Sequence, residues 1–245
     1  MVEAFMSSEP NRTVRELALA IPGATRVFEK VGIDYCCGGQ QSLADACAGA
    51  QLTVDDVMKS LKLAAESHSK AEEPNFLVAT LAELIDHIVD KHHVFTKNEI
   101  ERLRGLLNKV CGVHSQNHPA LQTLRTLFET LSVELGPHMI KEEQVLFPYV
   151  ERMEAAVHNK RPVIPPPFRT VANPVRMMMQ EHDDAGEFLR KMRRITSNYT
   201  PPEDACVSYQ TLYQALKAFE KDLHQHIHLE NNILFPRAVE MESAV

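Results

Sequence analysis

Hydrophobic residues recur at alternating gaps of three and four along the last two thirds of the chain. Residues at this spacing lie on one face of a helix, and that face becomes the core when helices pack into a bundle. The pattern stops at short stretches rich in Gly, Asn, Ser and Pro, which are typical of turns. It predicts an all-α, up-down-up-down bundle of four long helices. Their approximate ranges are 77–110, 120–153, 173–195 and 203–235.

Two of these helices carry the same motif. Residues 138–148 read HMIKEEQVLFP and residues 226–236 read HIHLENNILFP, so both follow the pattern His-x3-Glu-x3-Leu-Phe-Pro. Residues four apart on a helix lie one above the other, so each copy directs an imidazole and a carboxylate to a single point. This is the geometry of a pair of metal ligands, and the chain contains it twice.

The place of the two glutamates in the apolar series favours a metal site. Glu142 and Glu230 occupy core positions of their helices. A carboxylate in a core has no water to solvate it, and an isolated buried charge is costly unless it is paired or coordinates a metal. The alternative is that His138 and His226 are core histidines, each bonded to its neighbouring glutamate. For one copy the two interpretations are about equally good, and the repetition favours metal binding.

Each half of the bundle adds one more histidine. His182 lies on the inner stripe of the third helix, whereas in the first helix the earlier apolar residues favour His92 and the later ones favour His93. The repeat selects His93, because His93 and His182 are 89 residues apart and the two motifs are 88 apart. Four imidazoles and two carboxylates suit two metal ions roughly 3.5 to 4 Å apart. Nitrogen and oxygen donors favour iron first and manganese second.

Two prolines affect the predicted helices. Pro137 directly precedes His138, and a proline inside a helix removes one hydrogen bond and bends the axis. The apolar register continues unbroken to Val145, so we expect a bend at this proline rather than an end. Asn173 followed by Pro174 is typical of a helix cap and a first turn, and it predicts the start of the third helix.

The first 65 residues predict a small helical domain. After a frayed tail at about 1–11, the sequence TVRE at 13–16 forms a capping box that opens the first of several short helices. A polar stretch ending in proline, at 66–75, is typical of an interdomain linker, and the bundle takes residues 76–245.

The small domain contains a glycine-rich loop, GIDYCCGG at 32–39, that is expected to expose two adjacent thiols. Neighbouring cysteines form a disulfide only with backbone strain, so Cys36 and Cys37 are candidate thiols for accepting iron, reacting with nitrosyl species or reducing a metal site. The alternative is that one of them is buried and the other is incidental.

Composition argues against a membrane-spanning protein, a disulfide-rich protein and a nucleic-acid-binding protein. The chain has 245 residues, of which 44% are hydrophobic, and no apolar run approaches the roughly 20 residues that span a membrane. Its five cysteines are irregularly spaced, which argues against a disulfide framework and favours the cytoplasm. A net charge of −7 gives no electrostatic basis for binding nucleic acid.

The bundle resembles the hemerythrin-like family, and its combination with the loop DYCCGG at 34–39 resembles the Repair of Iron Centres family of the ScdA/YtfE type. The resemblance covers nearly the whole chain and includes both His-x3-Glu motifs and the stretch EHDDAGE at 181–187. It implies a non-haem di-iron centre with two carboxylate bridges beside an oxo or hydroxo bridge. The implied metal ligands are His93, His138, Glu142, His182, His226 and Glu230.

The resemblance also implies a function. Members are implicated in restoring iron–sulfur clusters damaged by nitric oxide or oxidants, so the expected partners are damaged iron–sulfur proteins, and the expected mode is iron donation. Glu181 becomes a candidate carboxylate on the route of iron; without the resemblance it is a solvated helix charge. Binding or reduction of nitric oxide at the di-iron centre is the alternative, so enzyme activity stays open, as does oligomerisation.

Overall fold

The structure is a computed structural model that describes residues 11–67 and 75–244. Most of the predicted tail and most of the predicted linker at 66–75 lie outside the described residues. The chain divides into two compact units, one holding the residues before Thr80 together with Ile227–Ile233, and the other holding the rest. Because Ile227–Ile233 lie within a continuous run of helix, we describe them with the helices on either side.

The N-terminal unit consists of short helices with well-defined ends. Thr13 caps the first of them, and it forms the predicted capping box with Glu16. Ser42 caps a later one, and Gly32 ends another in the left-handed conformation. Thr13 also forms an isolated β-bridge with Ser42. The helices are α2 (Val14–Ala20), α3 (Ala24–Val31), α4 (Leu43–Gly49) and α5 (Val54–Ser67).

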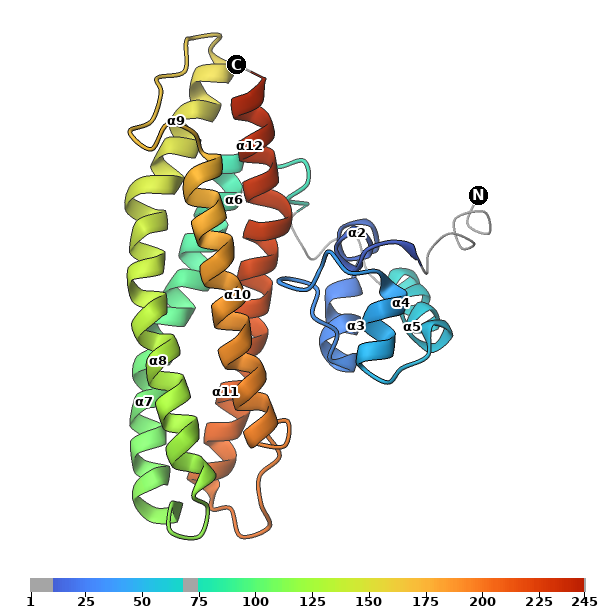
Figure 1. Cartoon of the computed structure of the whole chain (residues 1–245), viewed down its shortest axis with the longest axis vertical. Coiled ribbons are helices and arrows are strands. Elements are labelled where there is room, and N and C mark those ends of the chain that lie inside the picture. The colour runs from blue at the N-terminus through green and yellow to red at the C-terminus, as the bar shows by residue number, and fades with distance from the viewer. Residues whose placement is uncertain (1–10, 68–74, 245) are drawn as a thin grey trace. The chain divides into compact units, whose positions relative to one another are not determined.

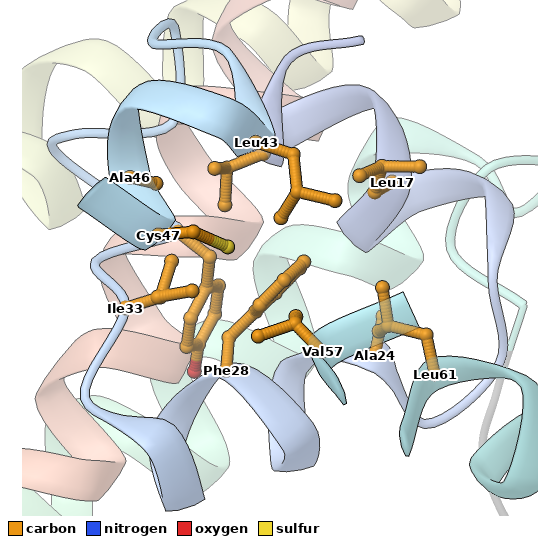
Figure 2. Packing of buried hydrophobic residues seen from close by; sticks show 11 residues of the cluster. Leu17, Ala24, Phe28, Ile33, Leu43, Ala46, Cys47, Val57 and Leu61 are labelled. Atoms are coloured by element: carbon orange, nitrogen blue, oxygen red, sulfur yellow. The ribbon is translucent and has the colours of Figure 1, made fainter. Parts of the chain in front are cut away.

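A single hydrophobic core holds this unit together. Phe28 lies at its centre and is completely buried, with Leu43 above it and Val57 beside it (Figure 2). Each helix contributes at least one residue that is 0 or 1% exposed. Because the helices are only 7 to 14 residues long, they depend on this core rather than on their own propensity.

The second unit is the predicted bundle of four long helical rods that run alternately up and down (Figure 1). The fold class is thereby confirmed, and none of the helices in the described residues is long and apolar enough to cross a membrane. The rods comprise α6 (Leu81–His87), η2 (Ile88–His93) and α7 (Val94–His114); α8 (Ala120–Lys141), η3 (Glu142–Leu146) and α9 (Phe147–His158); α10 (Ala172–Ile195); and α11 (Val207–Leu229), η4 (Glu230–Leu234) and α12 (Phe235–Ser243).

Three of the rods contain a π-helical turn, η2, η3 or η4, which the apolar pattern does not predict. A π turn inserts about one extra residue, so the core-facing register shifts by one position across it. The prediction that Val145 faces the core is therefore wrong: Val145 is 46% exposed, and Leu146 and Phe147 are buried in its place. In the first rod the same shift brings both His92 and His93 inside.

Of the two predictions made at prolines, the structure agrees with the one at Pro137 and contradicts the one at Asn173. Pro137 lies inside α8, which continues to Lys141, so the helix passes through it as expected. The predicted cap at Asn173 is wrong, because α10 begins at Ala172 and Asn173 already lies within its first turn. The Asn173 side chain instead donates to the carbonyl of Phe168 in the preceding loop.

The carboxylate of Glu242, in the last helix, joins three parts of the bundle. It accepts hydrogen bonds from the Val171 N–H at 2.9 and 3.0 Å, from the Thr170 hydroxyl, and from the Tyr149 hydroxyl at 2.7 Å. Burial alone would raise the pKa of Glu242, but these hydrogen bonds lower it below the ordinary value of 4.5. Burial and the nearby Glu242 carboxylate raise the pKa of Tyr149 to about 12.

We expect Glu242→Ala to lower the free energy of unfolding by about 2 kcal/mol at pH 7, because it leaves several buried donors without an acceptor. A carboxyl with a lowered folded pKa stabilises above its unfolded value, here 4.5, and loses that contribution as the pH falls through the folded value. The difference between wild type and variant should therefore shrink below about pH 4.5. Urea unfolding followed by circular dichroism measures it, with the exposed Glu240 changed to Ala as the control. An equal loss at pH 3 and pH 7 would contradict this account.

Candidate metal centre

All six residues predicted as metal ligands meet in the interior of the bundle. Each is 0 to 3% exposed, although glutamate is almost never fully buried unless it is paired. Three of them begin or end a π turn: His93 is the last residue of η2, and Glu142 and Glu230 are the first residues of η3 and η4. The others lie in regular α-helices, namely His138 in α8, His182 in α10 and His226 in α11.

The six side chains form two overlapping clusters. One contains His93 and His226, the other contains His138 and His182, and both contain Glu142 and Glu230. Within each cluster one ligand atom from every residue lies within 4.8 Å of all the others. Each cluster therefore offers two imidazole nitrogens and two carboxylates, and the carboxylates are shared.

The distances between ligand atoms support this convergence. The two Nε2 atoms of His93 and His226 are 3.1 Å apart, and those of His138 and His182 are 3.0 Å apart. Glu142 Oε2 is 3.5 Å from His93 Nε2, and its Oε1 is 3.3 Å from His138 Nε2. Glu142 therefore directs one oxygen toward a histidine of each cluster.

The donor set fits iron. Glu142 and Glu230 are 0% exposed, and burying two carboxylates this close together is costly unless cations neutralise them. The clusters contain nitrogen and oxygen donors and no thiolate, which suits a metal such as iron rather than a copper(I) ion. The bundle thus offers buried carboxylates that need cations to neutralise them, together with nitrogen and oxygen donors that suit iron.

Two further carboxylates orient the histidines from outside, and only one of them, Glu181, was expected from the sequence. Glu143 accepts from His93 Nδ1 at 2.7 Å and from Lys97 at 2.6 Å. Glu181 accepts from His138 Nδ1 at 2.8 Å and also binds Lys141. Such a carboxylate fixes the ring and leaves Nε2 toward the metal. The signal for Glu143 was its place directly after the candidate ligand Glu142.

Both outer carboxylates are held in the charged form. Burial alone would raise the pKa of Glu143, but hydrogen bonds from Lys97 and His93 lower it below its ordinary value. The same opposition acts on Glu181, where hydrogen bonds from Lys141 and His138 lower the pKa. A charged carboxylate makes the imidazole that donates to it a stronger metal ligand.

We expect Glu143→Gln and Glu181→Gln each to weaken iron binding about 10- to 100-fold, because each keeps the size of the side chain but removes the charge that supports a ligand histidine. Competition with a chelator of known affinity measures the apparent Kd for Fe²⁺. The control is Glu101→Gln, on the same bundle with a side chain that is 75% exposed. Equal affinity in all three variants would show that the outer carboxylates do not support the ligands.

His92 is buried but does not belong to either cluster. Its Nδ1 lies 3.0 Å from Asp222, and its ring stacks on that of His226 at 5.9 Å with an interplanar angle of 9°. His87 lies edge-on to it at 5.6 Å. His93, which the repeat selects, thus lies in one of the two clusters, and His92 packs behind His226.

A cavity of about 320 Å³ borders one of the clusters. His138 and His182 line it together with Pro137 and Lys141. Its wall also carries three acidic side chains, namely Glu134, Glu181 and Asp184. Glu181, the carboxylate singled out in the sequence, therefore contacts a ligand histidine and faces a cavity.

The cysteine loop of the N-terminal unit differs from its prediction. Cys36 is buried, with 4% of its surface exposed, and Cys37 is partly buried, so the expectation of two exposed thiols is wrong for Cys36. The Asp34 side chain accepts hydrogen bonds from the N–H groups of both cysteines, at 3.1 and 3.0 Å, and so fixes the turn of the loop.

Two family models match the chain. The model described as the hemerythrin HHE cation binding domain matches residues 84–238, which contain all six candidate ligands. The model described as a domain of unknown function (DUF542) matches residues 10–65, which contain the cysteine loop.

The chain is also similar over nearly its whole length to curated proteins. It is 35% identical to a probable iron–sulfur cluster repair protein of Haemophilus influenzae, over 91% of this chain and 95% of that protein. It is 38% identical to the iron–sulfur cluster repair protein YtfE of Citrobacter koseri and to that of Escherichia coli, in each case over 91% of this chain and 94% of the relative. With its two domain matches, the chain belongs to the YtfE-type family of iron–sulfur cluster repair proteins.

Proposed function

We propose that this protein restores damaged iron–sulfur clusters by donating iron from a pair of iron ions held in its bundle. The observation that carries the proposal is the sharing of Glu142 and Glu230 by two clusters of ligand atoms. Each cluster supplies four donors for one ion, and the shared carboxylates would link the two ions. Two iron ions bound in this way would supply iron that can be released, and they could change oxidation state.

The ligand set suits an ion that has to be released. Nitrogen and oxygen donors without thiolate hold Fe²⁺ less tightly than they hold later transition metals. The cavity beside His138 and His182 offers a route, because a passing cation meets Glu134, Glu181 and Asp184 along its wall. We assign Glu181 the first step on this route, since it contacts both the ligand His138 and the wall residue Lys141.

Cys36 and Cys37 complete the proposal as thiols that accept iron or supply electrons during repair. They lie side by side, with their sulfur atoms 3.8 Å apart and no disulfide between them. The clients we propose are cytoplasmic iron–sulfur proteins that have lost iron to nitric oxide or to oxidants. The names of the relatives, which specify repair of iron–sulfur clusters, support this choice.

Iron transfer tests the proposal directly. The full-length protein, loaded with ⁵⁷Fe, is mixed with a purified [4Fe–4S] enzyme whose cluster nitric oxide has destroyed, in the presence of a thiol reductant and sulfide. We expect ⁵⁷Fe in the rebuilt client cluster by Mössbauer spectroscopy and recovery of client activity. The zinc-loaded protein and the Glu142→Ala, Glu230→Ala double variant serve as controls.

Two other results would overturn the proposal. Formation of nitrous oxide by the reduced protein without a client, together with retention of all ⁵⁷Fe, would indicate a nitric oxide reductase. A stable nitric oxide adduct with neither turnover nor iron loss would indicate a protein that binds nitric oxide.

A further inference from the structure

A second set of metal-binding groups lies in the N-terminal unit. The carboxylate of Asp34 and the thiols of Cys36 and Cys37 place one ligand atom each within 4.8 Å of the other two. The two Sγ atoms are 3.8 Å apart, and Cys36 Sγ lies 3.3 Å from Asp34 Oδ1. These three residues differ from the bundle ligands in chemistry, because two of the three donors are sulfur.

The spacing of these atoms matches one tetrahedral ion. An ion that binds two thiolates at about 2.3 Å holds the sulfur atoms about 3.8 Å apart. A carboxylate oxygen at about 2.0 Å from the same ion lies about 3.5 Å from each sulfur. The observed separations of 3.8 and 3.3 Å therefore require little movement of the side chains.

We propose that Asp34, Cys36 and Cys37 form a binding site for a single thiolate-preferring divalent cation, Fe²⁺ or Zn²⁺. Three protein donors leave the fourth tetrahedral position open, as in zinc sites that exchange a ligand. A thiolate of a client protein can occupy that position and take over the ion. That last step rests on the proposed repair function, whereas the site itself does not.

The loop is built to hold this arrangement before an ion arrives. The Asp34 side chain fixes the backbone of both cysteines through their N–H groups. Gly39 packs so closely that a Cβ there would lie 2.8 Å from the Tyr35 carbonyl oxygen, so only glycine allows this path of the chain. The carbonyl of Gly39 accepts from the Arg15 N–H at 2.8 Å, which ties the loop to α2.

Binding at this site exchanges protons for the cation. Two thiols and M²⁺ give an M(SR)₂ unit and two H⁺, with no change of oxidation state. Affinity should consequently fall as the pH is lowered.

Cobalt provides a probe that separates this site from the bundle. Co²⁺ bound to thiolate absorbs in the near ultraviolet by charge transfer, and the nitrogen and oxygen ligands of the bundle do not produce this band. We expect titration of the full-length reduced protein with Co²⁺ to give the band at the intensity of one thiolate-bound Co²⁺ per chain, accompanied by proton release.

Variants assign the band to residues. Cys36→Ser and Cys37→Ser should each remove about half of the band or more and raise the Kd for Co²⁺ at least about tenfold. Asp34→Asn keeps an oxygen that can accept the loop N–H groups, so it should keep the band and weaken binding about tenfold. Cys206→Ser, which changes an exposed thiol in the bundle, is the control and should leave both unchanged. Circular dichroism verifies that each variant is folded.

The proposal is wrong if the folded wild type gives no charge-transfer band at saturating Co²⁺, or if the band survives in Cys36→Ser, Cys37→Ser and vanishes in Cys206→Ser. If Asp34→Asn binds Co²⁺ as tightly as wild type does, Asp34 is not a ligand of the site. Failure here is distinct from failure of the repair proposal, because iron content of the bundle and ⁵⁷Fe transfer are measured without Co²⁺.

Discussion

Glu142→Ala combined with Glu230→Ala should reduce the iron content of the protein from about two ions per chain to none. The two glutamates are the only residues common to both clusters, so their removal takes two donors from each ion at once. What is left for each ion is a pair of histidines, which does not hold Fe²⁺ against water and buffer.

The single variants carry additional information. Because each glutamate contributes to both clusters, either change alone should weaken both ions, and the combined loss should be far from additive. Elemental analysis gives the iron per chain, and Mössbauer spectroscopy tells a coupled pair from isolated ions. A matched double variant, Glu101→Ala with Glu240→Ala, removes two exposed carboxylates and should retain both ions.

Stability provides a second measurement. A metal that binds only the folded bundle stabilises it by about 2.7 kcal/mol at a free concentration one hundred times the Kd, so Fe²⁺ should raise the Tm of wild type and not that of the double variant. One tightly held Zn²⁺ in wild type, or a stable bundle that binds no metal, would instead mean that the repeated motif is core architecture.

Phe28→Ala should unfold the N-terminal unit and leave the bundle folded. Phe28 is 0% exposed at the centre of a small core, and truncating a buried phenylalanine costs about 3 to 5 kcal/mol. A unit of this size rarely has more than about 3 to 5 kcal/mol of stability, so the change removes most of it. Leu63→Ala, at a side chain of the same unit that is 57% exposed, is the control.

The cysteines report on each unit separately. Cys47 is 1% exposed in the N-terminal core and Cys111 is 1% exposed in the bundle. In Phe28→Ala, alkylation followed by mass spectrometry should detect rapid modification of Cys47, while Cys111 stays protected and the iron content is unchanged. Rapid modification of both cysteines would mean that the bundle depends on the N-terminal core.

The apolar periodicity was sufficient for the class of fold and the number of long helices, because burial of one face is the main force that specifies a helical bundle. The internal repeat selected His93 over His92, although the local pattern favoured each from one side. The capping signal at Thr13 also held, since it depends only on residues within one turn.

Predictions failed where distant segments determine local structure. Val145 is exposed because a π turn begins at Glu142, and Asn173 lies inside a helix that was expected to start with it. A π turn is less favourable than an α turn by itself, and it persists where the surrounding structure requires it. Here the three π turns each start or end at a candidate ligand.

By itself the sequence determined the all-α fold, the repeated motif and the six residues that meet in the bundle, because these depend on spacing along single helices. Only the tertiary structure decided that Glu142 and Glu230 are shared by two clusters, that Glu143 supports His93, and that Cys36 is buried beside Asp34. These features arise from contacts across helices or around a folded loop. Such contacts are set by packing and leave no periodic trace in the chain.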